Sequence, residues 1–348
     1  MTMTELASAA ASLVSGGRGI LPLEQPPAIA NAQLALLGIT RSEDARIAFR
    51  ELAITAPGLE RYVSGVLLDR EALRQRTSAG RRFVDVLRAR GIVPGIALAG
   101  DAVPLPAAPG ETVVEGLDGL RGRIAEAAAL GAGFATFGAT FTADDAGLPS
   151  DRAIAANVHA LARFAALAQE RRIVPFVHVA VDCESAPAMD ACADATERIL
   201  RALVAELAAC GVALDALILQ PAMVTPGADV TQRADAATVV SATLRVLGAT
   251  VPVAVAGIAF TAGGAEEHDA TEYLCAMNRT MPRRRPWPLT FSFGGDVRER
   301  ALGAWRGRDE RVAEAQRELV RAAQSSGLAA CGAYVVPAGE RRTAAAAA

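Results

Sequence analysis

Eight short apolar segments, each of strand length, recur along the chain with longer amphipathic stretches between them. Their residues are mostly apolar in succession rather than alternating with polar ones, as expected for strands buried on both faces of a sheet. Eight such strands with helices between them predict an α/β fold, the (β/α)8 TIM barrel. The predicted strands are Gly19–Glu24, Tyr62–Asp69, Val93–Ala99, Phe134–Gly138, Val174–Val181, Leu217–Val224, Val251–Phe260 and Leu289–Gly295.

Helical patterns fill the stretches between these strands. Ser150 is a suitable N-cap for a helix over Ala153–Gln169, because its hydroxyl can accept a hydrogen bond from a backbone N–H of the first turn. Ala193–Cys210 and Asp235–Leu247 show the same amphipathic pattern and predict two more helices.

The ends of the chain and its organisation follow from the same pattern. Residues 1–18 and 40–57 predict extra helices outside the barrel. No low-complexity linker divides the chain, so we expect a single barrel domain with an N-terminal helical extension over residues 1–340. The alanine-rich tail over residues 341–348 is expected to be disordered.

Charge and hydropathy exclude several classes of partner. The formal net charge is -3, which gives no electrostatic reason to bind nucleic acid or an anionic membrane. The one dense basic run, Arg283 to Arg285, is predicted to be a solvated loop. The apolar segments are too short and too often interrupted to cross a membrane, and the N-terminus lacks the basic region of a signal peptide. We therefore expect a cytoplasmic protein.

The cysteines give the same expectation. There are five, an odd number, and none forms a CxxC motif, so the default is a reduced protein without disulfides. Cys192, Cys210 and Cys275 fall in helical patterns and are expected to be small buried hydrophobic residues, whereas Cys183 is expected in a loop. The fifth cysteine is Cys331.

Several segments resemble the motifs of one family, the class I fructose-bisphosphate aldolases. The resemblance runs nearly in register from about residue 5 to about residue 337 and implies that fold. Residues 16–21 (GGRGIL) resemble its GKGIL opening, residues 62–68 (YVSGVLL) its YISGVIL, residues 115–120 (EGLDGL) its QGLDGL, residues 220–227 (QPAMVTPG) its KPNMVTPG, residues 276–278 its AMN, residues 291–294 (FSFG) its FSYG, and residues 304–305 its AW.

The resemblance fails at the lysine on which the family's chemistry depends. Enzymes of this family form a Schiff base between a lysine amine and a ketose carbonyl. Gln220 stands where the motif has that lysine, and all 35 residues of the Lys+Arg count are arginine. An arginine cannot replace the lysine, because its guanidinium stays protonated and is a poor nucleophile. Schiff-base chemistry is therefore not expected.

Other positions that the resemblance marks as catalytic or phosphate-binding differ as well. Acidic or basic side chains of the family become small residues, or polar residues of another kind. Glu24 replaces an aspartate, Ala97 and Thr136 replace lysines, Gly138 and Gly295 replace arginines, His178 and Ala180 replace glutamates, and Ala262 replaces a serine.

The polar residues that remain at the expected barrel mouth define the candidate site. Catalytic residues of such barrels lie at the carboxyl ends of the strands. We expect Glu24 and His178 there as a general acid and base, with Gln220 and Thr136 as hydrogen-bond donors. The alternative is that these are leftover polar groups in a decayed pocket.

Binding of the substrate is expected from one side chain and four glycines. Ser292 lies at the end of the last strand, and backbone N–H groups of glycines can hold an anion. The four glycines are Gly263, Gly264, Gly294 and Gly295.

No metal and no cofactor is expected. The chain has only three histidines, too few for a metal enolate of the class II aldolase kind. The side chains of His178, Asp182 and Cys183 could still hold a metal, although their spacing matches no common metal motif. His159 falls in a predicted helix, where a structural role is expected, and His268 falls in an acidic segment expected to be a solvated loop.

Three functions stay open from the sequence. The first is a repurposed barrel enzyme that uses acid–base catalysis on a small molecule. The second is a non-catalytic aldolase homologue that senses a sugar phosphate or serves as a scaffold. The third is a working fructose-bisphosphate aldolase, a lyase of glycolysis, which the missing lysine argues against. The resemblance also implies a homo-oligomer, most often a tetramer.

Overall fold

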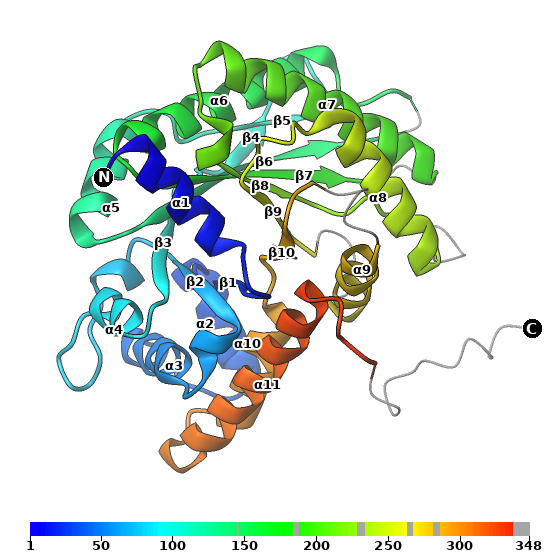
Figure 1. Cartoon of the computed structure of the whole chain (residues 1–348). Helices are drawn as coiled ribbons and strands as arrows, with labels where there is room; N and C mark the ends of the chain where they lie inside the picture. Colours follow the sequence, from blue (N-terminus) through cyan, green and yellow to red (C-terminus); the bar gives the residue numbers. More distant parts are fainter. Residues whose placement is uncertain (145, 184–187, 228–233, 263–266, 281–285, 337–348) are drawn as a thin grey trace, which may run out of the picture.

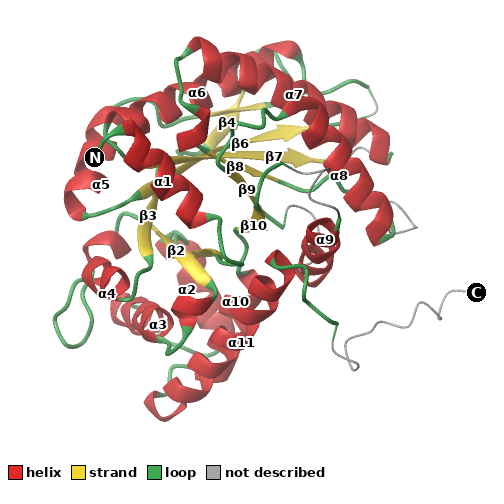
Figure 2. Ribbon diagram, viewed as in Figure 1, coloured by secondary structure: helices red, strands yellow, loops and turns green. Residues whose placement is uncertain are grey.

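Eight parallel strands, paired in the order in which they occur along the chain, form the central barrel of the computed structural model. Residues 1–144, 146–183, 188–227, 234–262, 267–280 and 286–336 are described. Helices surround the strands on the outside (Figures 1 and 2), which confirms the predicted (β/α)8 barrel. The strands are β1 (Gly19–Pro22), β2 (Val63–Leu68), β3 (Val93–Ala97), β6 (Phe134–Thr142), β7 (Val174–Asp182), β8 (Ile218–Pro221), β9 (Gly257–Phe260) and β10 (Leu289–Phe291).

The first and last strands approach one another closely enough to bring the sheet near closure. The hydroxyl of Thr290 donates a hydrogen bond to the carbonyl of Arg18 at 2.6 Å. A Cβ at Gly19 would lie 2.4 Å from the carbonyl oxygen of Phe291, so β1 can run this close to β10 only with a glycine at that position.

The predicted helix starts are confirmed where a side chain caps them. Ser150 accepts from the backbone N–H of Ala153, and Asp235 accepts from that of Thr238. The helices are α1 (Met3–Leu13), α2 (Pro27–Leu36), α3 (Glu43–Thr55), α4 (Phe83–Ala89), α5 (Leu120–Leu130), α6 (Asp151–Glu170), α7 (Met189–Ala209), α8 (Ala236–Thr250), α9 (Glu267–Arg279), α10 (Gly295–Trp305) and α11 (Val312–Ala330).

Some predicted boundaries are wrong. The strand expected over Val251–Phe260 is only β9, because the chain turns before it: the indole of Trp287 donates to the carbonyl of Pro252 at 2.8 Å, and Pro252 itself has no N–H for a sheet. Conversely, β6 continues past Gly138 and pairs with β7 as far as Thr142 and Asp182.

Elements without a sequence prediction also appear. Helix α2 starts at Pro27, a residue suited to the first helical position because its missing N–H needs no partner there. Strands β4 (Ala102–Pro104) and β5 (Thr112–Val114) form a separate antiparallel pair outside the barrel. Helices α1 and α3 lie within the two stretches, 1–18 and 40–57, that predicted extra helices.

Helix α1 closes the end of the barrel from which the strands start. Its Leu6, Ala10 and Leu13 are buried in one apolar cluster with Phe134 and Phe176, residues of β6 and β7. That cluster fixes which side of each strand faces the barrel interior. Because side chains alternate along a strand, the residues two positions later face inward again, one layer nearer the carboxyl ends.

Three further sequence predictions concern membrane spans, the C-terminal tail and the run of three arginines. None of the described helices combines the length and the apolar character that a membrane span requires. The predicted tail over residues 341–348 and the basic run Arg283 to Arg285 lie outside the described residues.

Candidate active site at the barrel mouth

A layer of polar side chains lies directly above the apolar floor of the barrel. Thr136 follows Phe134 by two residues, His178 follows Phe176 and Gln220 follows Ile218, so all three face inward. The strand register sets His178 directly beside Gln220. The sequence-predicted residues from β6, β7 and β8 are therefore brought together.

Gln220 is held in place by Ser292. Its Nε2 donates a hydrogen bond of 2.8 Å to the Ser292 hydroxyl, and both side chains are buried. Its Oε1 is also shielded from solvent but has no hydrogen-bond partner among the described residues. A buried acceptor without a partner is costly, so this amide oxygen is available to a ligand that carries a donor.

His178 is an imidazole without a charge at neutral pH. Burial lowers its pKa from 6.5 to about 4, and its Nε2 lies buried without a partner. Its ring packs against Gly138, the residue opposite it on β6. A neutral imidazole can donate or accept a hydrogen bond, but it is a weak base.

Glu24 lies just beyond β1. Its side-chain carboxyl group is buried away from solvent. Burial raises its pKa from 4.5 to about 7, although its own backbone N–H and the charge of Arg298 oppose the shift. The charge of Asp69 adds to it. Its Oε2 is buried without a partner. A carboxyl that titrates near neutrality is suited to both accepting and donating a proton.

Glu24 and His178, predicted as the general acid and base, lie just beyond β1 and within β7, and their side chains make no direct contact with each other. Both residues are described, and neither a hydrogen bond nor a charge interaction joins their side chains. Glu24 interacts instead with Arg298 of α10. The geometry thus yields one titrating group, Glu24, and one separate neutral group, His178.

A sequence model of the family described as fructose-bisphosphate aldolase class-I matches residues 5–348. This chain belongs to the class I fructose-bisphosphate aldolase family. It is 39% identical over 333 residues to a probable fructose-bisphosphate aldolase class 1 of Xylella fastidiosa, covering 95% of this chain and 99% of the relative. It is 36% identical to the cytosolic fructose-bisphosphate aldolase 4 of Arabidopsis thaliana, covering 95% of this chain and 84% of that one.

A solved structure of the family has the same fold. The fructose-bisphosphate aldolase of Plasmodium falciparum, crystallised with TRAP and a small-molecule inhibitor, superposes with a TM-score of 0.92. The two chains are 33% identical, and the match covers 96% of each. The aldolase scaffold is therefore retained along nearly the whole chain, although the sequence contains no lysine.

Only part of the predicted phosphate-binding set can be placed on this aldolase scaffold. Gly294 precedes α10 and Gly295 is its first residue, so their amides lie at the positive end of the helix dipole. Gly263 and Gly264, the other two predicted amides, lie outside the described residues. The Ser292 hydroxyl accepts a hydrogen bond from Gln220, so its predicted role in substrate binding would use its own O–H as a donor.

Two residues of the aldolase mouth were missed by sequence reasoning. Thr261 follows the inward-facing Ala259 by two residues, and its hydroxyl is buried without a partner. The alternation of β9 could have predicted it. Arg298 lies in the first turn of α10, and its buried Nε has no partner. Nothing in the sequence indicated that this arginine would reach Glu24.

The cysteine predictions need a correction. Cys183 and Cys192 form a disulfide with a Cα–Cα distance of 6.0 Å, so neither is a free thiol. Cys183 directly follows β7, and Cys192 lies in the first turn of α7. Cys275 is buried as predicted, whereas Cys210 is only partly buried.

The other metal-binding candidates are accounted for by the fold. Among the described residues no group of three His, Cys, Asp or Glu side chains could hold a metal ion. His159 lies on the surface of α6 with its Nδ1 2.7 Å from Glu206. His268 was predicted in a solvated loop, and this was wrong, because it is partly buried in the first turn of α9.

Proposed function

We propose that this chain is an aldolase-family enzyme that acts on a small molecule without a Schiff base, with Glu24 as the group that transfers the proton. The observation that supports the proposal is the Glu24 carboxyl itself. It lies at the barrel mouth, has a pKa of about 7, and has an enclosed oxygen without a partner. General acids and bases work best when their pKa is near the working pH.

The absence of lysine supports a reaction that needs no imine. The chain has no lysine amine, and Gln220 is neutral and not nucleophilic. The N-terminal amine is near Glu5, at 3.8 Å, on the helix that closes the opposite end of the barrel from the mouth. An electron sink for carbon–carbon cleavage is therefore missing from the side chains of the mouth.

The neighbours of Glu24 in the proposed site would bind rather than transfer protons. His178 stays neutral and offers Nε2 as a hydrogen-bonding group. Gln220, fixed by Ser292, offers Oε1, and Thr136 adds a hydroxyl to the same layer. The substrate we propose is less phosphorylated than a sugar bisphosphate, because Gly295 replaces the family's phosphate-binding arginine.

A first experiment tests for the imine. The purified protein is incubated with fructose 1,6-bisphosphate or dihydroxyacetone phosphate, then treated with borohydride, and its intact mass is measured. We expect no adduct in the wild type and no cleavage of fructose 1,6-bisphosphate in a coupled assay. An adduct on the wild type, or loss of an activity on borohydride treatment, would show that a Schiff base forms and would overturn the proposal.

A second experiment tests the role of Glu24 on substrates found by a screen of small hydroxy and keto compounds. Glu24→Gln is expected to lower kcat/KM by about 10²–10⁴-fold. The matched control is Glu299→Gln on the exposed face of α10, which should keep the wild-type rate. Binding of a sugar phosphate with no turnover of any substrate would instead favour a non-catalytic homologue that senses a sugar phosphate.

The homo-tetramer implied by the resemblance remains a prediction. Light scattering of the purified protein tests it.

A further inference from the structure

We infer that the cavity between α2, α3 and α10, beside Glu24, is a binding site for a small carboxylate. The cavity encloses about 30 Å³. Leu23 and Gln25, the neighbours of Glu24 in the chain, form part of its wall. We take this carboxylate to be one end of the substrate on which Glu24 acts. Only this assignment rests on the proposed function.

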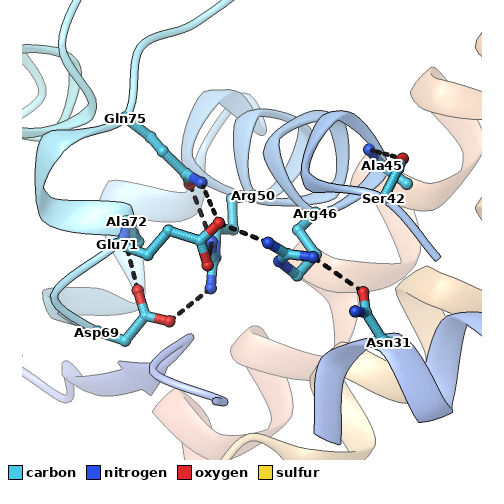
Figure 3. Close-up of polar contacts among 9 residues, drawn as sticks. All are labelled: Asn31, Ser42, Ala45, Arg46, Arg50, Asp69, Glu71, Ala72 and Gln75. Carbon is cyan, nitrogen blue, oxygen red and sulfur yellow. Dashed lines mark hydrogen bonds and ion pairs between the residues drawn. The ribbon is translucent and has the colours of Figure 1, made fainter. Parts of the chain in front are cut away.

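The cavity is lined by three guanidinium groups, and two of them already have acidic partners. Arg46 and Arg50 reach from α3 toward the end of β2 (Figure 3). Arg46 forms an ion pair with Glu71 at 2.7 Å, and Arg50 forms one with Asp69 at 2.8 Å. These two arginines are therefore neutralised by the protein itself.

The third guanidinium, that of Arg298, is not neutralised in this way. In the described part of the chain no carboxylate lies within ion-pairing distance of it, and its hydrogen bond is a long one, 3.4 Å to the carbonyl of Pro22. The charge of Arg298 acts on the carboxyl of Glu24, whose pKa of about 7 leaves it partly protonated near neutral pH. Arg298 thus leaves the wall of the cavity with excess positive charge.

Two N–H donors of the lining have no acceptor. The Nε atoms of Arg46 and Arg298 are both buried, and neither has a partner in the part of the chain that the structure describes. Buried donors nearly always have an acceptor, supplied by protein, water or ligand. A carboxylate has two oxygens that accept charged hydrogen bonds from guanidinium groups, and its negative charge would balance Arg298.

The size and the character of the walls narrow the class of anion. By the same measure of volume a single water needs roughly 10–15 Å³, so the cavity of about 30 Å³ has room for the two oxygens of a carboxylate. A phosphoryl group has more oxygens and a second charge, and among the described lining residues no further buried donor lacks a partner to bind them. Leu34, Phe49 and Leu302 make the rest of the wall apolar, which suits the carbon next to a carboxylate.

The test uses formate and acetate as probes on the full chain. Each is titrated by calorimetry and by thermal shift, at constant ionic strength set with chloride, and inorganic phosphate is the size control. The wild type is compared with Arg298→Gln, which removes the free charge, and with Ala30→Leu, which fills the cavity but keeps all three arginines. Arg317→Gln, on the exposed surface of α11, is the matched arginine control.

We expect saturable binding of formate or acetate to the wild type and to Arg317→Gln, and at least tenfold weaker binding to Arg298→Gln and Ala30→Leu. Equal responses in all four proteins, or no binding to the wild type, would overturn the site. Phosphate that binds as tightly as formate would overturn the carboxylate assignment. If formate binds as expected but Glu24→Gln keeps the wild-type activity, the proposed function is wrong and the carboxylate site is not. The failures of the two proposals are therefore distinguishable.

Discussion

The His178 side chain occupies the space that a side chain at residue 138 would need. Gly138 and His178 are partners across β6 and β7, and a Cβ at 138 would lie 2.6 Å from His178 Nδ1 and 2.9 Å from its Cβ. No real Cβ comes that close to another atom without a shift of the structure. The inward imidazole therefore requires a glycine at residue 138.

We expect Gly138→Ala to destabilise the fold by about 1–3 kcal/mol, because the added methyl overpacks the barrel interior and displaces the imidazole. In a His178→Ala background, the same change should cost much less, since the clashing ring is gone. Urea unfolding of the wild type, both single variants and the double variant measures the coupling between the two sites.

Gly122→Ala is the control for this pair. Gly122 lies in α5 with nothing within 4 Å of its added Cβ, so alanine there is expected to stabilise by about 0.5–1 kcal/mol. If Gly138→Ala costs as much in the His178→Ala background as in the wild type, the two residues do not compete for the same space.

Glu24 should make the stability of the protein fall as the pH rises. Its pKa is about 7 in the folded state against 4.5 ordinarily, so between these values the folded protein holds a proton that the unfolded chain releases. Stability from this group is complete below pH 4.5 and is lost through pH 7. Glu24→Gln should therefore gain stability relative to the wild type across this window, by up to about 3 kcal/mol at pH 8.

The comparison must be made between variant and wild type, because His178 works in the opposite sense. The pKa of His178 is about 4 in the folded protein and 6.5 in the unfolded chain. As the pH falls from 6.5 to 4, the unfolded chain therefore binds a proton that the folded protein does not, and the fold loses stability. This contribution cancels in the difference. Urea unfolding of both proteins at half-unit steps from pH 4.5 to 8.5 measures the difference in their free energies of unfolding. A difference that does not change with pH would show that the Glu24 carboxyl is not buried.

The barrel and the inward layer of its mouth could be predicted because both follow from local alternation. Apolar runs gave the strands, and the inward direction of Phe176 carries over to His178 two residues later. Val251–Phe260 was misread because apolar composition alone does not distinguish a strand from the turn that Pro252 imposes.

The electrostatics of the site could not be predicted, because they depend on contacts between distant segments. Arg298 is 274 residues from Glu24 in the sequence, yet its charge acts on that carboxyl. Likewise the pKa of His178 depends on how completely its neighbours exclude water, which no motif records. The residue types were visible in the sequence, but their protonation states were not.

Replacing Arg50, a buried residue of α3, should lower the stability of the fold more than replacing most other residues of the outer helices. Its side chain is only 5% exposed, and it bonds Asp69 at 2.8 Å and Gln75 at 2.9 Å (Figure 3). Arg50→Met leaves the Asp69 carboxylate without its cation, and losing one partner of such a pair costs about 3–5 kcal/mol. Arg201→Met, which breaks an exposed pair with Glu197 inside α7, should cost only a few tenths of a kcal/mol.

Urea unfolding at neutral pH measures both changes. Equal losses for Arg50→Met and Arg201→Met would mean that the interior pair contributes no more than a surface one. Because Arg50 also lines the carboxylate cavity, formate titration of Arg50→Met is informative only if this variant keeps the folded baseline of the wild type.

The disulfide between Cys183 and Cys192 is open to a direct count. The chain has five cysteines, of which Cys210, Cys275 and Cys331 are free. Protein prepared without reductant and then denatured should therefore show three reactive thiols, and five after reduction. Cys192→Ser should show four under both conditions, because it frees its former partner. Five reactive thiols in the denatured, unreduced wild type would rule the bond out and restore the reduced state that the sequence predicted.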